Sequence, residues 1–274
     1  MISTHKWFLK TQAAFPTYKT GIMAKTNNAL RKLFITIVLI SLHSVIYAES
    51  PYRKVIYNSF VNRQMYKWEA VLRTMDAVNE PTSIEQKLEH IDYYYGYIAH
   101  LIGKKQFNEA DEELIKANRL VDNLIKISPK NATAYAYKGA FIGLKIATNR
   151  LKSVYLKPES NAYINKALEL DPQNSQAHID KGNMLFYAPR IIGGDKKNAL
   201  NYYLRAMQLI EKNKDTNQNW RYLNLLTIIG IAYEKIDMLA EAKLAYEKAL
   251  RKEPNYKWVK DDLYPNLLAK IKNQ

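Results

Sequence analysis

The sequence predicts an all-α chain in which antiparallel helix pairs stack into an α-solenoid, with a capping helix at its C-terminal end. Three observations support this fold class. Small and large apolar residues recur at helical spacing, prolines recur where successive helix pairs would join, and no segment shows the strict alternation of a half-buried strand. A hydrophobic content of 47% over 274 residues is sufficient for a continuous core.

The clearest unit lies between Leu223 and Tyr256. In this segment Gly230 and Tyr233 are followed, at helical intervals, by Ala242, Tyr246, Ala249 and Pro254. Glycine and alanine let two helix backbones approach closely, the tyrosines fill the space between helix pairs, and the proline ends the second helix. The spacing therefore predicts two packed helices joined by a turn, in a repeat of about 34 residues.

The same pattern extends upstream with departures from regular spacing. One long helix is expected over Tyr52–Val78, followed by a helix capped by Ser83 that ends near Gly103. A helix from about 132 is expected to continue to Leu156, with its partner starting at Lys157–Glu159. The expected regions are a degenerate helical region at 51–128, regular units at 129–256 and a capping helix at 257–274, interrupted at Pro265.

The first 48 residues have the pattern of a targeting segment. Leu33–Ile46 is a mostly apolar run that follows Arg31 and Lys32 and precedes Ala48. It is shorter than the roughly 20 residues of a membrane span, and its flanks are those of a secretory signal peptide. The alternative is a buried core helix. We expect a signal peptide at 23–48 and a mature chain from Glu49, with 1–22 being either a mis-assigned leader or a disordered lead before a start at Met23.

These repeats resemble the tetratricopeptide repeat (TPR) family, most specifically over Ser175–Tyr256 and Asn161–Pro172, and loosely over Ser83–Pro129. Nothing before Pro51 supports the resemblance. It implies a superhelix of helix pairs that presents a concave groove to a protein or peptide. The groove would be lined by four positions on each first helix. The candidate binding residues implied are Asp92, Tyr95, Ala140, Asn183, Phe186, Asn224 and Glu234.

The third unit carries an insertion, Ala188–Asp195, which includes Arg190, Gly193 and Gly194. One interpretation is an anion cradle at the start of the following helix. The other is a turn with two permissive glycines and Asp195 as the helix cap. A phosphate loop normally follows a strand, and none is expected here, so the turn is favoured. The insertion could still form one rim of the groove.

The sequence contains no motif for catalysis, a cofactor or a metal site. There is no phosphate loop, HExxH, GxSxG or GxGxxG, and His90 and His100 are too far apart to chelate a metal together. The absence of cysteine excludes disulfides, thiolate metal sites and a lipidation cysteine. We therefore expect no enzyme, no cofactor and no bound metal.

The formal charge of +15 is weaker evidence for a nucleic-acid partner than its size suggests. Six of the 41 basic residues precede Ala48, which leaves 35 basic against 26 acidic residues in the remainder, a charge of +9. In the helices the two signs alternate, as in Glu241–Lys243, which is typical of a solvated face rather than of a nucleic-acid surface.

Two functions remain open from the sequence. The first is a non-enzymatic scaffold, exported to the periplasm or secreted, that binds a protein or peptide segment in its groove. The second is a small-ligand-binding accessory protein of an envelope transport system. A pocket enclosed by Tyr95, Ala140 and Phe186 would favour the second, and an open channel the first. We expect no membrane span after signal cleavage, and the sequence does not indicate an oligomeric state.

Overall fold

The computed structural model describes residues 50–78, 83–149 and 153–273, and every regular element in these ranges is helical. The expectations for 1–22 and 23–48 lie outside the described residues. Besides a short 3-10 turn at Arg190–Ile192 and a π-helical turn at Trp258–Leu263, the described elements are α2 (Pro51–Asn62), α3 (Met65–Ala77), α4 (Ile84–Gly103), α5 (Phe107–Ile127), α6 (Ala132–Thr148), α7 (Ser153–Leu170), α8 (Ser175–Tyr187), α9 (Lys196–Lys212), α10 (Trp220–Lys235), α11 (Leu239–Lys252) and α12 (Tyr264–Lys272).

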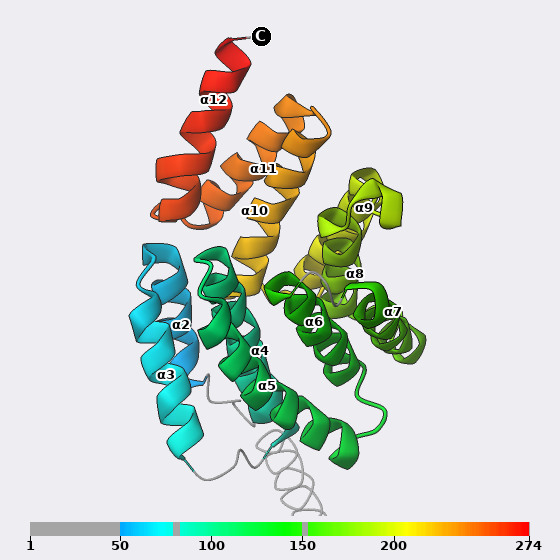
Figure 1. The fold of residues 1–274 in the computed structure, drawn as a ribbon. Coiled ribbons are helices and arrows are strands. Elements are labelled where there is room, and N and C mark those ends of the chain that lie inside the picture. Colours follow the sequence, from blue (N-terminus) through cyan, green and yellow to red (C-terminus); the bar gives the residue numbers. More distant parts are fainter. Residues whose placement is uncertain (1–49, 79–82, 150–152, 274) are drawn as a thin grey trace, which may run out of the picture. The chain divides into compact units, whose positions relative to one another are not determined.

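The helices from α4 to α11 stack in sequence order as four antiparallel pairs (Figure 1). Each helix packs on the next along the chain, and the first helices of the first three pairs, α4, α6 and α8, also contact one another in turn. This arrangement confirms the expected all-α solenoid. The pair α2–α3 precedes the four pairs, and α12 follows them.

Three of the first helices, α6, α8 and α10, are each capped at the N-terminus by an asparagine. Asn131, Asn174 and Asn219 each accept a hydrogen bond from the backbone N–H three residues on, at 2.9, 2.9 and 3.0 Å. Ser83 caps α4 in a reciprocal capping box with Gln86, and Asp195 caps α9, both as the sequence predicts. Each cap satisfies a backbone donor that the helix leaves free and so fixes where the helix begins.

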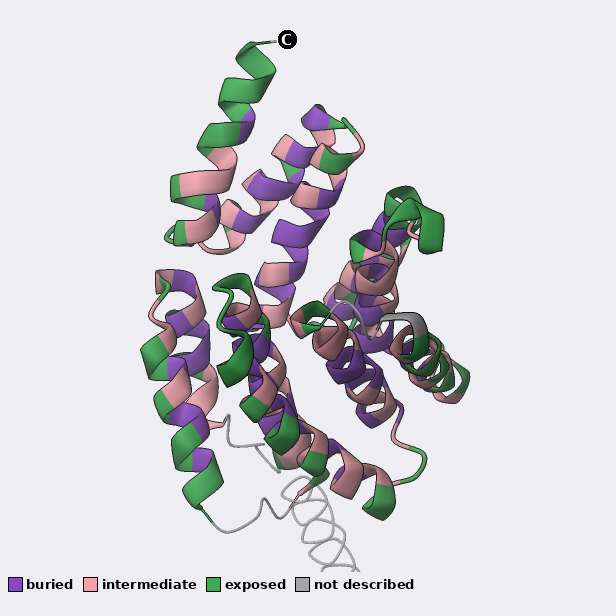
Figure 2. Ribbon diagram, in the orientation of Figure 1, coloured by how far each residue is buried: buried purple, intermediate pink, exposed green. Residues whose placement is uncertain are grey.

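Two glycines on first helices, Gly182 of α8 and Gly230 of α10, each lie against a tyrosine on the second helix of the same pair. A Cβ atom at Gly182 would lie 2.4 Å from the Tyr203 ring, and one at Gly230 would lie 2.2 Å from the Tyr246 ring. Both tyrosines are fully buried. Figure 2 shows the pattern of burial along the array, in which each helix has a buried side that faces its neighbours. We call these two contacts the glycine–tyrosine seams.

The expected long helix over Tyr52–Val78 is wrong, because the chain reverses at Arg63. That residue adopts a left-handed conformation with a φ of 58°, and the N–H of Gln64 donates to the Ser59 carbonyl at 2.8 Å. The break lets α3 fold back on α2 and brings the rings of Phe60 and Trp68 together, 6.4 Å apart. One straight helix would have left part of this apolar surface in water.

One of the two proline-based boundaries is also wrong. Pro158 does not start a helix but lies inside α7, which begins at Ser153, while α6 ends at Thr148 rather than near Leu156. Pro265 marks a change of helix type, since the π-helical turn ends at Leu263 and Pro265 lies in the first turn of α12. The π-helical turn Trp258–Leu263 leads directly into that helix.

The C-terminal cap is built around Tyr256, Val259 and Leu267, which are fully buried. Trp258, the largest side chain of the expected capping segment 257–274, is only half-buried. Its replacement by alanine should therefore cost less than the roughly 3–5 kcal/mol of a fully buried tryptophan.

The pair α2–α3 also contacts the far end of the repeat array. Arg53 pairs with Asp215 at 2.7 Å, the Tyr57 hydroxyl donates to Glu253 at 3.2 Å, and Arg63 pairs with Asp262. The Trp220 ring lies 5.0 Å from the Trp68 ring. These contacts join residues far apart in the sequence and tie α2 to α10 and the segments on either side of α10–α11.

Candidate functional site

The first helices contribute polar side chains to one connected network, which we call the inner polar cluster. Its members come from α4, α6, α8, α9 and α10, so it depends on how successive pairs stack rather than on any one helix. They are Asp92, Tyr95, Tyr137, Gln176, Asp180, Asn183, Tyr203, Trp220 and Arg221.

Asp92 anchors one end of the cluster. Its carboxylate accepts hydrogen bonds from the Tyr137 hydroxyl at 2.6 Å and from the Trp220 indole N–H at 2.8 Å, and Arg221 Nε lies 3.3 Å away. Burial raises the pKa of Asp92, and the Arg221 guanidinium opposes that shift. Burial likewise lowers the pKa of Arg221, but Tyr137, Asp92 and Asp215 more than offset this, so the guanidinium stays charged.

Arg221 also links the two ends of the cluster. Its Nη1 donates to the Tyr137 hydroxyl at 3.2 Å and to the Gln176 side-chain oxygen at 3.1 Å. The Gln176 amide in turn donates to both Asp180 oxygens, at 3.1 and 3.0 Å. Through these bonds the side chain of a residue on α10 orients residues on α4, α6 and α8.

Asp180 occupies the other end, with no cation in hydrogen-bond contact among the described residues. Only 3% of it is exposed, and burial raises its pKa to about 8. Beside it the Asn183 amide donates to the Tyr95 hydroxyl at 3.0 Å and accepts from the Tyr203 hydroxyl at 2.9 Å. A neutral Asp180 carboxyl is therefore the favoured form near pH 7, which lowers the cost of burying it.

Tyr187 stands at the edge of the cluster and faces solvent. Its side chain is 70% exposed, and burial by the surrounding protein raises the pKa of its hydroxyl. It interacts electrostatically with Tyr95 and Tyr203, and its ring meets that of Phe186 edge to face at 5.0 Å. Tyr187 therefore offers an accessible aromatic surface next to the buried polar groups.

The structure brings three of the predicted groove residues together in the cluster: Asp92, Tyr95 and Asn183. Ala140 and Phe186 are buried, with 7% and 8% exposed. Asn224 is half-buried on α10, while Glu234 accepts a hydrogen bond from Tyr246 of α11. The predicted positions thus mix side chains that hold the fold with side chains that border solvent, and ligand binding by them stays a prediction.

The insertion forms a closed turn. The N–H groups of Gly193 and Gly194 donate to the carbonyls of Arg190 and Pro189, both at 3.0 Å. Gly193 has a φ of 85°, and a Cβ at Gly194 would lie 1.9 Å from the Ala188 oxygen. Because these amides are already bonded within the chain, the geometry favours the turn over the anion cradle.

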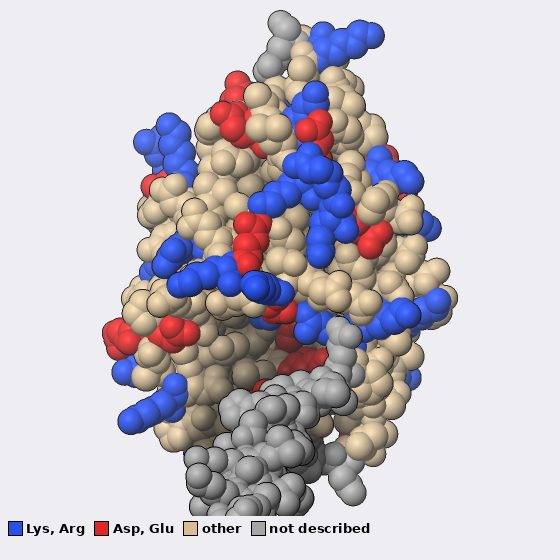
Figure 3. Space-filling model, turned by 180° about the vertical axis from the view of Figure 1, so that it is seen from behind, with Lys and Arg blue, Asp and Glu red and all other residues tan. Residues whose placement is uncertain are grey.

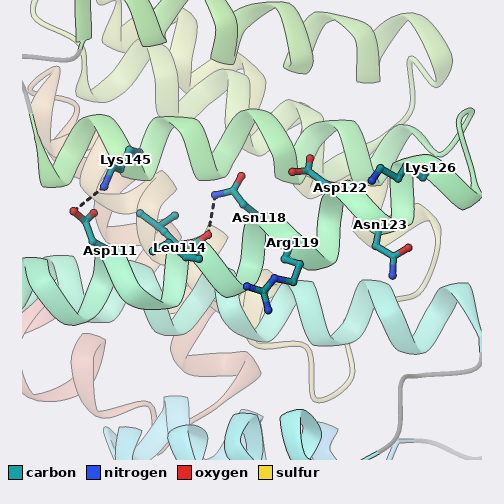
Figure 4. A pocket seen from close by; sticks show the side chains of 9 residues that line it. Asp111, Leu114, Asn118, Arg119, Asp122, Asn123, Lys126 and Lys145 are labelled. Atoms are coloured by element: carbon teal, nitrogen blue, oxygen red, sulfur yellow. Dashed lines mark hydrogen bonds and ion pairs between the residues drawn. The ribbon is translucent and has the colours of Figure 1, made fainter.

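A separate cavity of about 740 Å³ lies along α5, next to Lys145 of α6 (Figure 4). The pair Lys145–Asp111 closes one end at 2.7 Å, and Leu114 and Ile115 supply its apolar wall. Arg119 and Lys126 line the opposite part. The cavity is therefore at a different place from the predicted enclosure by Tyr95, Ala140 and Phe186.

Charge is mixed over the surface rather than gathered into one stripe. On the face shown in Figure 3, lysines and arginines are spread widely, with acidic side chains between several of them. Within the described residues no group of three His, Asp or Glu side chains could hold a metal ion. None of the described helices combines the length and the apolar character needed to cross a membrane.

Sequence reasoning missed Arg221, Trp220 and Asp180 as members of the site. A signal was present for Arg221, which is the sole charge in the mostly apolar run from Trp220 to Ala232. A lone charge near a helix start is usually solvated, however. Only the fold, which brings the start of α10 within hydrogen-bond reach of side chains on α4, α6 and α8, gives it buried partners.

Two solved structures illustrate the likeness to known proteins. The TPR protein TTC0263 of Thermus thermophilus has a TM-score of 0.50 at 15% identity, over 78% of this chain and 99% of that chain. The pilF protein of Pseudomonas aeruginosa is 20% identical, over 69% of this chain and 72% of that chain, but its TM-score of 0.41 is too low to carry an argument. No family profile matches the chain, and no curated protein matches it. The likeness supports the helical-repeat solenoid fold.

Proposed function

We propose that this chain is a non-enzymatic TPR scaffold that binds a segment of a partner protein along the inner face of its first helices. The observation that carries this proposal is the inner polar cluster, which fixes four first helices relative to one another and leaves Tyr187 accessible at its edge. A preformed surface binds without first ordering its own side chains.

The chemistry at the edge of the cluster suits an extended peptide. The Tyr187 ring provides an anchor for an apolar side chain, and the half-buried Asn183 amide and Arg221 guanidinium belong to the inner polar cluster beside it. Tyrosine and arginine dominate the energetics of protein interfaces because they combine large contact area with hydrogen bonding. Fixed amides and guanidinium groups can bind the carbonyls of an extended backbone.

The test is a comparison of affinities for one partner, purified with the wild-type chain from the envelope fraction of its own host. Tyr187→Ala should weaken binding about fivefold to thirtyfold, the loss expected for one interface anchor. Leu244→Ala, at a residue that is 60% exposed on α11, is the matched control and should leave affinity unchanged. Equal affinities for wild type and Tyr187→Ala would reject this surface.

The insertion is the competing site on the same molecule. If it is the contact, deletion of 189–194 should abolish binding while Tyr187→Ala has no effect. Alanine substitutions at Phe186 and Asn183 are poor probes, because Phe186 is buried and Asn183 bonds both Tyr95 and Tyr203. Their replacement would disturb the fold along with any binding.

A second candidate function is the binding of a small ligand, which the cavity beside α5 favours. Its mixed wall could hold a polar molecule with an apolar part. Native mass spectrometry of the chain taken from its host should then show a bound small molecule that is lost in Ile115→Trp, which fills the cavity. A chain without bound mass would count against this function.

The proposed setting is the bacterial envelope, after export. Its support is the basic flank, apolar run and Ala48 of the N-terminal segment. Sequencing the N-terminus of the protein from its host should give Glu49 or a near neighbour. Recovery of a chain that still starts at Met1 or Met23 from the cytosol would contradict export.

A further inference from the structure

The insertion presents apolar side chains outward from an ordered turn. Ile191 is 93% exposed and Ile192 is 47% exposed, although isoleucine is among the most frequently buried residues. The turn is held by its own hydrogen bonds, by the Asp195 N–H donating to the Leu185 carbonyl at 3.0 Å and by the Lys157 ammonium on the Ile192 carbonyl. The two isoleucines are therefore displayed on a fixed support.

Cations flank this apolar pair in the sequence. Arg190 precedes it, and Lys196 and Lys197 follow in the first turn of α9; all three are exposed, and within the described part of the chain none of their side chains has a hydrogen bond or ion pair. The acidic residue among them, Asp195, is committed to capping α9. We call Arg190–Ile192 with Lys196 and Lys197 the insertion tip.

The position of the two lysines is unfavourable for the helix itself. The N-terminal turn of a helix carries partial positive charge, which favours acidic side chains there and disfavours lysine. Helix α9 has no acidic residue in its first turn. The positive charge at the tip is thus not explained by helix stability, and an external anionic partner would be stabilised by it.

We infer that the insertion tip contacts an anionic phospholipid surface, with Ile191 and Ile192 entering the headgroup region and the three cations binding lipid phosphates. Apolar side chains flanked by lysine and arginine are the composition of segments that lie in a membrane interface. A protein partner fits less well, because a stable protein interface needs about 800 Å² on each side and this tip is a short convex turn.

The test uses the full chain with a single fluorophore. Because the chain has no cysteine, Ile191→Cys can be labelled uniquely with an environment-sensitive nitrobenzoxadiazole probe. Leu244→Cys, at another exposed site, is the matched control. Both proteins contain the same N-terminal segment, so any membrane binding by that segment is common to the two, whereas the probe reports its own surroundings.

With vesicles of phosphatidylcholine and phosphatidylglycerol, emission at position 191 should rise at least about twofold and shift to the blue, while position 244 stays unchanged. Phosphatidylcholine alone should give a much weaker response. Lys196→Gln and Lys197→Gln, added to Ile191→Cys, should each weaken the apparent affinity about fivefold, and higher salt should weaken it further.

Two outcomes would overturn the inference. One is a position-191 signal that does not respond to anionic vesicles, and the other is an equal response at position 244. A signal that ignores vesicles but responds to the purified protein partner would instead assign the insertion tip to a protein contact. Circular dichroism should show unchanged helix content for every variant, since all the changed residues are exposed.

Discussion

The glycine–tyrosine seams and the inner polar cluster hold the array together in different ways. Each seam joins the two helices of one pair, as Gly230 of α10 joins Tyr246 of α11, and it works by steric fit. The cluster joins side chains from Asp92 to Arg221 across successive pairs, and it works by charge and hydrogen bonds. The seams therefore hold the two helices of a pair together, whereas the cluster fixes one pair relative to the next.

The two regions also tolerate change differently. A seam excludes added volume, because its partner ring is fully buried and a tight contact is already made. The cluster tolerates a change of shape better than a loss of charge balance, because a buried carboxylate that loses its guanidinium is left uncompensated. Substitutions of matched size can test this contrast.

The largest effect is expected in the cluster. Arg221→Met keeps much of the side-chain length but leaves Asp92 without its cation, so unfolding should become easier by about 3–5 kcal/mol, the usual cost of breaking a buried pair on one side. Urea denaturation followed by circular dichroism measures it.

The double variant Arg221→Met with Asp92→Asn is the control for charge. It removes both charges and should recover part of the lost stability. If the double variant were as unstable as the sum of the two single variants, the charge pairing would not be the reason for the loss.

The next effect tests a seam. Gly230→Leu should cost about 3 kcal/mol or more, because the Cβ alone would lie 2.2 Å from the Tyr246 ring. Gly230→Ala should already destabilise. The matched control is Gly103→Ala, where an added Cβ meets nothing within 4 Å. Thermal melts in which both alanine variants behave like wild type would mean that the ring moves aside freely.

The smallest effect concerns the pH dependence contributed by Asp180. Its folded-state pKa of about 8 lies above the ordinary carboxyl value of 3.8, so the folded chain keeps a proton that the unfolded chain releases. That stabilisation is fully present below about pH 4 and is lost as the pH rises through 8.

Asp180→Asn keeps the site neutral at every pH. Between pH 5 and pH 8.5 the free energy of unfolding of wild type should fall by about 2 kcal/mol relative to that of this variant. Parallel denaturation curves at several pH values measure the difference. A difference that does not change with pH would show that Asp180 is ionised in the fold throughout.

The sequence predicted the residues of the seam at Gly230 and Tyr246, but it placed the tyrosine between helix pairs rather than against the glycine of its own pair, and it predicted only part of the cluster. Gly182 and Gly230 hold the small position of their first helices, and Tyr203 and Tyr246 recur on the second helices, so local periodicity was enough to identify them. Asp92, Tyr95 and Asn183 were found from their positions on first helices, but Asp180 and Arg221 were not. Contacts such as that of Trp220 with Asp92, which lies 128 positions away, depend on the angle between pairs, and no local pattern encodes that angle.

The same limit explains the missed reversal at Arg63. Apolar spacing over Tyr52–Val78 fits one helix as well as two, since both bury the same face. The choice between one helix and two depends on an aromatic contact. The centroid of the Phe60 ring lies 5.7 Å from that of Trp220 and 5.3 Å from that of Tyr256. Trp220 and Tyr256 belong to the other end of the described chain.

The contacts of α2 with that distant end have a consequence for how the protein unfolds. In an open repeat array each unit touches only its neighbours, so the ends can fray while the middle stays folded. Here Arg53 and Tyr57 of α2 bind Asp215 and Glu253, so loss of α2 also exposes the segments on either side of the α10–α11 pair. Unfolding should therefore be a single cooperative event. Folding should be limited by the slow formation of these contacts, because they join residues far apart in the sequence.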